Sequence, residues 1–245
     1  MKSMHTTTTF RLRTVIAAVL FMFTLPLAAQ DVPQSDIPMN IATIGAGNIG
    51  GTVGGLFAEA GHQVFFSSRH PQELQPLVEK YAPNARAGTV EEAIAFADVI
   101  LLAVPYKAMP QISRDHADAL AGKIILDAGN PIPRRDGDMA EPALEKGAGI
   151  ATKEYLPGAS IVRAFNSISY RSFASEAHRD GPKLAVPLAG NNRKAVLIAA
   201  QLVIDAGFEP VVAGDLEAGR KFDYGSDLFV KEMTASELRR ALGLE

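Results

Sequence analysis

Residues 41–69, IATIGAGNIGGTVGGLFAEAGHQVFFSSR, set the architecture of the chain. A short apolar run, 41–44, meets a G-x-G-x-x-G cluster at 45–50. A helix-like segment, 49–60, follows, and a second apolar run, 63–67, comes after it. A glycine-rich turn that ends a strand and opens a helix, within one β-α-β unit, is the fingerprint of a dinucleotide-binding domain.

The three glycines of the cluster have separate mechanical roles in this fingerprint. Gly45 makes the tight turn, Gly47 lets a pyrophosphate approach the backbone, and Gly50 allows close packing of helix on strand. The start of the helix offers unpaired N–H groups and the positive end of its dipole to the phosphates. The alternative is a turn and a packing helix that bind no ligand.

The end of the second predicted strand indicates which nucleotide binds. NAD sites usually carry Asp or Glu there, whereas this chain has Ser67, Ser68 and Arg69. Two hydroxyls and a guanidinium can hydrogen-bond and neutralise a 2′-phosphate. We therefore predict NADP(H) as the cofactor. The alternative is that Arg69 is a solvated loop cation and that either nucleotide binds.

Apolar runs alternate with helix-like segments along the rest of the chain. This alternation predicts an α/β fold, a Rossmann-type doubly wound and mostly parallel sheet with a small C-terminal α/β extension. We expect an NADP-binding domain at 39–165 and a smaller substrate-side portion at 166–245. The predicted strands are 41–44, 63–67, a short one near Arg86, 98–104, 123–127, 161–165, 184–188 and 209–213.

Helix signals fall between these runs. Capping boxes at 89–92 and 234–237 predict two helix starts. The stretch 129–158 is too long for a plain connection, so it is expected to hold a short helix or a site. The other predicted helices are 49–60, 71–81, 107–120 and 193–206.

The first 29 residues resemble a secretory signal peptide. Basic residues at 2, 11 and 13 precede an apolar run, 15–29, that ends in Ala28 and Ala29. Cleavage after Ala29, followed by a linker at 30–38, predicts a periplasmic or secreted protein. The alternatives are an uncleaved anchor, or a cytoplasmic protein whose translation starts at Met39.

Composition excludes several classes of function. The chain has no cysteine, so disulfides and thiol chemistry are absent. Removing 1–29 takes away three basic residues and no acidic ones, so the net charge falls from −3 to −6, which disfavours nucleic acid as a partner. No later segment reaches membrane-spanning length. The histidines show no ligand spacing, and Asp136-Gly137-Asp138 reads as a turn, so no metal site is predicted.

The chain resembles the F420-dependent NADP oxidoreductases, whose nucleotide domain is also similar to that of eukaryotic membrane ferric reductases. The resemblance covers roughly 39–220. Besides the opening stretch, it rests on the segments DVILLAVPYKAM (98–109), KIILDAGNP (123–131), IVRAFNSI (161–168) and LAGNNRKAVLIAAQLVIDAGFEPVVAGDLEAGR (188–220).

The resemblance implies roles for individual residues. Asn48 and Ile49 would join the glycines around the pyrophosphate, and Ser68 and Arg69 would hold the 2′-phosphate. Val104 and Pro105 would lie along the cofactor. Asn130 and Asn166 would face the nicotinamide pocket, or would instead only cap their loops. No residue is predicted to be catalytic.

The reaction implied is hydride transfer between the nicotinamide and a deazaflavin (F420) or flavin-like ring. Such chemistry needs positioning more than a protein acid or base. A metal chelate could replace the ring as electron acceptor. A non-catalytic NADP-binding or regulatory domain, and a reductase of the hydroxyacid or pyrroline-carboxylate type, are the alternatives. The partner is a small redox molecule, and a homodimer is among the assemblies left open.

Overall fold

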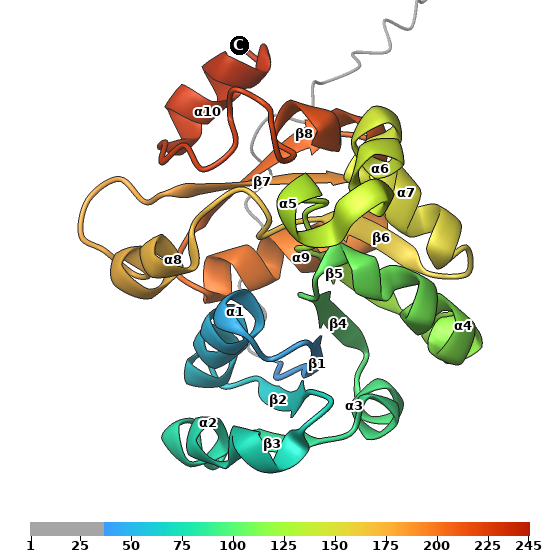
Figure 1. Ribbon diagram of the computed structural model, residues 1–245. Helices are drawn as coiled ribbons and strands as arrows, with labels where there is room; N and C mark the ends of the chain where they lie inside the picture. The colour runs from blue at the N-terminus through green and yellow to red at the C-terminus, as the bar shows by residue number, and fades with distance from the viewer. Residues whose placement is uncertain (1–36) are drawn as a thin grey trace, which may run out of the picture. The chain divides into compact units, whose positions relative to one another are not determined.

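A computed structural model describes residues 37–245. The leader predicted at 1–29 lies outside the described residues, as does most of the predicted linker. The described part contains an eight-stranded sheet with helices on both faces (Figure 1). Its strands are β1 (Asn40–Ile44), β2 (Gln63–Ser67), β3 (Ala85–Gly88), β4 (Val99–Leu102), β5 (Ile124–Asp127), β6 (Ser160–Arg163), β7 (Ala185–Gly190) and β8 (Glu209–Gly214).

The strand order is β3-β2-β1-β4-β5-β6-β7-β8. The first six strands of that order are parallel, β7 runs antiparallel to β6, and β8 runs parallel to β7. The order 3-2-1-4-5-6 is that of the doubly wound dinucleotide fold. The predicted fold class is therefore confirmed, and the antiparallel step marks where the C-terminal strands join the same sheet.

The helices follow the expected alternation. The structure has α1 (Asn48–Glu59), α2 (Gln75–Lys80), α3 (Val90–Phe96), α4 (Met109–Leu120), α5 (Pro133–Asp136), α6 (Ala140–Lys146), α7 (Ala148–Tyr155), α8 (Tyr170–Glu176), α9 (Arg193–Asp205) and α10 (Ala235–Leu242). Short 3₁₀ turns add η1 (Pro71–Leu74), η2 (Tyr106–Ala108), η3 (Gly137–Met139) and η4 (Leu216–Lys221). Three of these helices, α5 to α7, fill the stretch 129–158.

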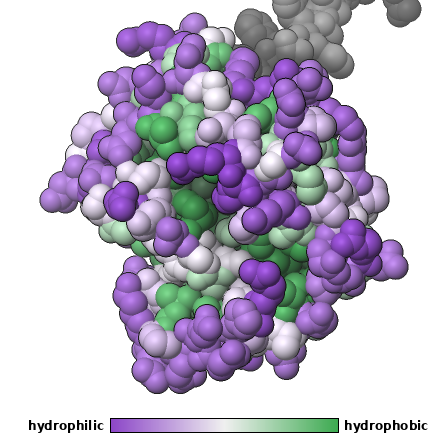
Figure 2. All heavy atoms as spheres, in the orientation of Figure 1, coloured by the Kyte–Doolittle hydropathy of each residue, from purple (hydrophilic) through white to green (hydrophobic). Residues whose placement is uncertain are grey.

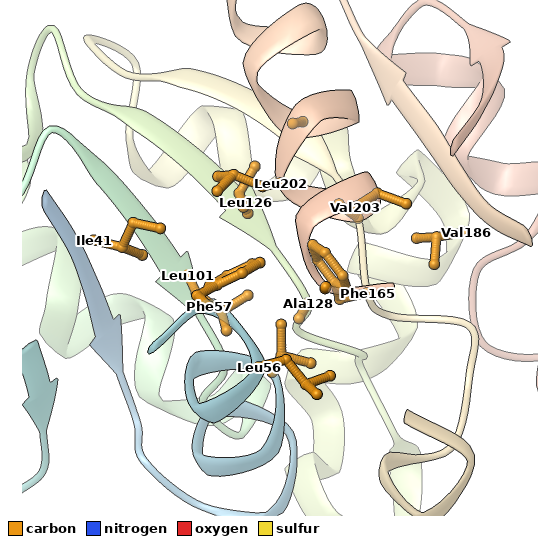
Figure 3. Close-up of a cluster of buried hydrophobic side chains, with 14 of the residues drawn as sticks. Ile41, Leu56, Phe57, Leu101, Leu126, Ala128, Phe165, Val186, Leu202 and Val203 are labelled. Atoms are coloured by element: carbon orange, nitrogen blue, oxygen red, sulfur yellow. The ribbon is translucent and has the colours of Figure 1, made fainter. Parts of the chain in front are cut away.

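Two apolar layers enclose the sheet. One joins α1, α8 and α9 to the sheet, and Phe57 packs edge-on against Phe165 there, with ring centroids 5.7 Å apart (Figure 3). The other joins α3, α4 and α7 to the opposite face, around Ile100 and Ile125. Because β1, β4 and β5 are covered on both sides, they read as continuous apolar runs in the sequence.

A third, smaller apolar cluster lies at the C-terminal end of the sheet. It joins β7 and β8 to Phe222 and to Leu238 of α10. The capping box predicted at Thr234 forms, and so does the one at Thr89, where the Glu92 carboxylate accepts from Thr89 N at 2.8 Å. The domain boundary at 165/166 stays a prediction, since β7 and β8 extend the same sheet.

Two predicted elements differ from the structure. The helix expected at 71–81 is a 3₁₀ turn followed by the short α2, because Pro76 lacks an N–H and cannot continue a helix begun at Pro71. The strand expected at 161–165 ends at Arg163. Phe165 has a φ of 59°, a left-handed conformation that no strand accommodates.

No helix within residues 37–245 combines the length and the apolar character needed to cross a membrane.

Candidate functional site

The loops that follow four neighbouring strands lie side by side at one edge of the sheet. This is the carboxyl edge of the parallel strands, where ligands bind in open α/β sheets. Backbone hydrogen bonds continue one residue beyond the strands and join these loops: Gly45 N to Ser67 O (3.2 Å), Ala103 N to Ile44 O (2.9 Å), Ala128 N to Leu102 O (3.0 Å) and Ala164 N to Asp127 O (3.3 Å). Figure 2 shows a hollow with apolar side chains on this face, beside hydrophilic side chains over α5.

The glycine turn has the geometry that the sequence predicts. Gly45 has a φ of 92°, and a Cβ there would lie 2.6 Å from the carbonyl oxygen of Ala103. A Cβ on Gly50 would collide with the Gly45 carbonyl. In contrast, a Cβ on Gly47 would meet no atom within 4 Å. Gly45 and Gly50 are therefore required by the protein itself, whereas the space at Gly47 is open to a ligand.

Within the described part of the chain, no side chain caps the start of α1. Gly47 is the N-cap and provides no side-chain cap, and the first turn contains no acidic residue. The first N–H groups of a helix have no partner within it. Because these N–H groups lie beside the open space at Gly47, the turn fits a pyrophosphate. The predicted contacts of Asn48 and Ile49 with the pyrophosphate are consistent with this geometry and stay a prediction. The Ile49 side chain itself packs against the apolar core.

The three residues at the end of β2 have different environments. The Ser67 side chain is buried, and its hydroxyl donates to the Thr43 carbonyl at 2.7 Å, so it does not face a 2′-phosphate as predicted. Ser68 accepts from His70 N at 2.9 Å and shapes the turn. Arg69 is exposed, and no ion pair holds its guanidinium among residues 37–245. The cation is thus available to an anion beside the glycine turn.

The predicted cofactor contacts after β4 lie in the loop that packs on the glycine turn. Val104 is half-buried and Pro105 is exposed. A Cβ on Gly45 would lie 2.9 Å from Cγ1 of Val104, so the two loops are in close contact. This placement is consistent with Val104 and Pro105 lying along a bound cofactor, and their role stays a prediction.

The two predicted nicotinamide-side asparagines are brought together by the fold. Asn130 Nδ2 donates to the backbone oxygen of Asn166 at 2.8 Å. Asn166 is buried, and its Nδ2 donates to the carbonyl of Phe222 at 3.2 Å, while its Oδ1 has no hydrogen-bond partner among the described residues. Asn130 is half-buried and is therefore the more accessible of the two.

A buried charge cluster that the sequence analysis did not predict lies next to these asparagines. Arg163 is fully buried, and its Nη2 lies 2.5 Å from Oδ1 of Asp223. Its Nη1 lies 3.0 Å from Oδ2 of Asp127. The signal that could have found Arg163 is a single cation inside the otherwise apolar run IVRAF. Its partner Asp223, 60 residues away, could not be paired with it from sequence.

Burial and mutual attraction shift the pKa values in this cluster. Burial raises the pKa of Asp127, although Arg163 beside it favours the charged form. Burial alone would lower the pKa of Arg163, but the carboxylates of Asp223 and Asp127 raise it overall. Burial and the charge of Asp127 also raise the pKa of Tyr106, so its phenol stays protonated at neutral pH.

The chain is similar in sequence and in fold to known proteins. The chain is 27% identical over 204 residues to "Metalloreductase STEAP3" of Rattus norvegicus, an alignment that covers 80% of this chain but 39% of the rat protein. It is 27% identical over 218 residues to "F420-dependent NADP reductase" of Methanothermobacter thermautotrophicus, covering 83% of this chain and 93% of that protein. A solved structure of SMa0349 from Sinorhizobium meliloti superposes with a TM-score of 0.70 at 28% identity, covering 80% of this chain and 95% of the other.

Residues 40–131 match the family described as "NADP oxidoreductase coenzyme F420-dependent". The match begins at β1 and includes the glycine turn, Arg69, the loop at Val104 and Asn130. The resemblance drawn from the sequence is thereby confirmed. Residues 40–131 therefore resemble the nucleotide-binding part of the NADP-dependent oxidoreductases of this family.

Proposed function

We propose that the protein transfers hydride between NADP(H) and a flat redox ring, either the deazaflavin F420 or a flavin. The observation that carries this proposal is the open space at Gly47 beside the exposed guanidinium of Arg69, which forms no ion pair within residues 37–245. The first feature suits a pyrophosphate and the second a 2′-phosphate. Similarity to an F420-dependent NADP reductase over most of both chains supports the choice of acceptor.

Binding of the nucleotide is divided between two places on the carboxyl edge. The N–H groups at the start of α1 would donate to the pyrophosphate, where the helix dipole also favours negative charge. Arg69 would form charge-assisted hydrogen bonds to the 2′-phosphate, with the Ser68 hydroxyl as a second contact. Ser67 would contribute indirectly. Its carbonyl accepts from the N–H groups of Gly45 and Ala46, and it thereby holds the glycine turn in place.

The chemical step needs orientation more than acid–base help. NADPH supplies the hydride from its nicotinamide ring, and the protein contributes geometry and exclusion of water. Val104 and Pro105 would lie against the cofactor between the phosphates and the ring. Asn130 and Asn166 end the same row of loops and would border the nicotinamide. No described residue has to act as a nucleophile in this scheme.

A ferric chelate is the second candidate acceptor. The observation that favours it is the similarity to a rat metalloreductase over 80% of this chain. Since this chain spans only 39% of that protein, the activity of the longer protein is not carried over as a whole. Both candidates use the same nucleotide site, but their electron counts differ. A ring accepts the two-electron hydride directly, whereas a ferric ion accepts one electron, so each NADPH must reduce two ferric ions.

Export is part of the proposal. The basic start and the apolar run at 15–29 favour a periplasmic or secreted protein. An exported NADP-dependent enzyme must either bind its nucleotide before export and carry it across the membrane, or bind it outside the cytoplasm. A cytoplasmic form that starts at Met39 would need neither.

The decisive experiment measures NADPH oxidation by the purified full chain with F420, FMN, FAD or ferric citrate as acceptor. We expect turnover with one of the ring acceptors. The matched control is Gly47→Val, which fills the phosphate space and should be inactive with every acceptor. Turnover with ferric citrate alone would favour the metalloreductase reading. Tight NADPH binding without any turnover would favour a non-catalytic NADP-binding protein.

A further inference from the structure

Asp223 joins three parts of the chain that are far apart in sequence. Its Oδ1 accepts from Nε of Arg163 at 3.0 Å and from Nδ2 of Asn166 at 3.4 Å. Its Oδ2 accepts from the backbone N–H of Ala148 at 3.0 Å, at the start of α7. Asp223 itself lies just after η4, and its side chain is buried.

Arg163, the partner of Asp223, also contacts the loop that follows β5. Its Nη1 donates to the carbonyl oxygens of Asp127 at 2.9 Å and of Gly129 at 2.7 Å. Its Nη2 lies 3.4 Å from Oδ1 of Asn130, which in turn donates to Asn166. One guanidinium therefore fixes the backbone of the loop after β5, while its carboxylate partner fixes Asn166 in the loop after β6.

The loop after β6 is also held in a strained conformation. Phe165, in this loop, has a φ of 59°. Val230, in the C-terminal segment that contacts the loop, has a φ of 53°, and side chains of this size are rare at such values. The backbone N–H of Val230 donates to the carbonyl of Ser167 at 2.9 Å, so the C-terminal segment clamps this loop at two points, Asp223 and Val230. Strain of this kind persists only when surrounding contacts over-determine it, and it is concentrated at functional sites.

We propose that Asp223 and Arg163 are positioning residues that hold the loops 128–131 and 164–167 against the nicotinamide end of the cofactor. The inference rests on the proposed function, because it assigns the nicotinamide to this end of the carboxyl edge. A buried ion pair is often no more stabilising than apolar residues of the same volume. Here it supplies what apolar residues cannot, namely donors for the backbone of the loop after β5 and an acceptor for the Asn166 side chain in the loop after β6.

The test compares Asp223→Asn with the wild type, using the full chain and whichever of F420 or FMN the wild type reduces. The variant keeps the shape of the side chain and removes the charge opposite Arg163. We expect kcat to fall about 10- to 100-fold, as misplacement of a reacting group does. The Kd of NADPH should stay nearly unchanged, because the contacts at Gly47 and Arg69 are untouched.

Two further readouts separate positioning from general stability. With NADPH deuterated at C4 on one face or on the other, in separate assays, the wild type should lose deuterium from the nicotinamide in only one of the two, and Asp223→Asn in both. Hydrogen exchange in 128–131 and 164–167 should be faster in the variant. The control is Asp205→Asn, which breaks another buried pair, Asp205 with His62 at 3.0 Å, away from the carboxyl edge. It should lower Tm but preserve facial selectivity.

If Asp223→Asn does not fold, Arg163→Lys replaces it, since a lysine keeps the buried positive charge but loses the guanidinium that donates to Asp223, Asp127 and Gly129 together. Wild-type facial selectivity and exchange in a folded variant would overturn the inference. Failure of the proposed function looks different: the wild type itself then oxidises no NADPH. In that case the exchange comparison still decides whether Asp223 orders the two loops.

Discussion

Nη2 of Arg163 and Oδ1 of Asp223 lie 2.5 Å apart although 60 residues separate them in the chain. Arg163 ends β6, a strand of the nucleotide-binding sheet, and Asp223 belongs to the segment that leads to α10. The contact ties the C-terminal segment to the edge of the sheet where the cofactor is expected. The C-terminal segment thus contributes a buried side chain to the candidate site.

Arg69→Ala tests the choice of nucleotide. The substitution removes a charge-assisted contact worth about 1.5–3 kcal/mol, so NADPH should bind roughly 10- to 150-fold more weakly. NADH lacks the 2′-phosphate, and its affinity should change little. Calorimetric titration with both nucleotides measures the difference.

The control for this prediction is Arg193→Ala, which removes an exposed arginine at the start of α9. Asn192, its neighbour, contacts Ser160 at the beginning of β6, so this position lies at the opposite edge of the sheet. Equal weakening of NADPH and NADH in Arg69→Ala would contradict the 2′-phosphate assignment.

Gly47→Val and Gly50→Ala should fail in different ways. Gly47 has φ −77° and ψ −154°, which any residue can adopt, and a Cβ there meets open space. We therefore expect Gly47→Val to fold with a nearly unchanged Tm and to lose dinucleotide binding. At Gly50 the added methyl collides with the Gly45 carbonyl, which should cost about 1–3 kcal/mol of stability. Thermal unfolding with and without NADPH distinguishes the two, and tight binding by Gly47→Val would refute the phosphate site.

Asp136→Asn should destabilise the protein in a pH-dependent way. Burial alone would raise the pKa of Asp136, but hydrogen bonds from Arg135, Ile132 N and Lys107 N lower it overall. A lowered pKa stabilises the folded state above the unfolded value of about 3.8, and this stabilisation is lost as pH falls through the folded pKa.

The loss at neutral pH should be about 1–3 kcal/mol, as for other charge-assisted hydrogen bonds. Denaturant unfolding of the wild type and Asp136→Asn at several pH values measures it. The difference in free energy of unfolding between wild type and Asp136→Asn should become smaller below about pH 3.8. A difference that does not change with pH would mean that the carboxylate charge of Asp136 contributes nothing to the stability of the folded protein.

Export predicts that the mature chain begins at Gln30. Cell fractionation and N-terminal sequencing of the natural protein check this. A protein confined to the cytoplasm with Met39 as its first residue would rule out the signal peptide. That result would leave the nucleotide site as described, because the described part of the chain includes all of it.

Local pattern was enough to predict the sheet, the glycine turn and the cation at Arg69. These features depend on residues that are close in sequence. Alternating apolar runs indicate which segments are buried, and a glycine in a turn indicates a backbone position that has no room for a side chain. The break of the predicted helix at Pro76 is also a local effect that the sequence contains. The left-handed Phe165 is different, because contacts with distant parts of the chain, among them Phe57 and Phe173, surround a bulky residue in that conformation.

Tertiary structure alone decided which polar side chains meet. Ser67 resembles a phosphate ligand in sequence, yet it is buried and its hydroxyl donates to the Thr43 carbonyl, since the register of β2 on β1 pairs Ser67 with Ile44, the residue after Thr43. Arg163 stands out in sequence as a single cation in an apolar run, but nothing in the sequence pairs it with Asp127 or Asp223. They become one buried cluster because parallel strands end at a common edge and a later segment folds back over it, and such long-range contacts depend on the whole chain rather than on any one segment of it.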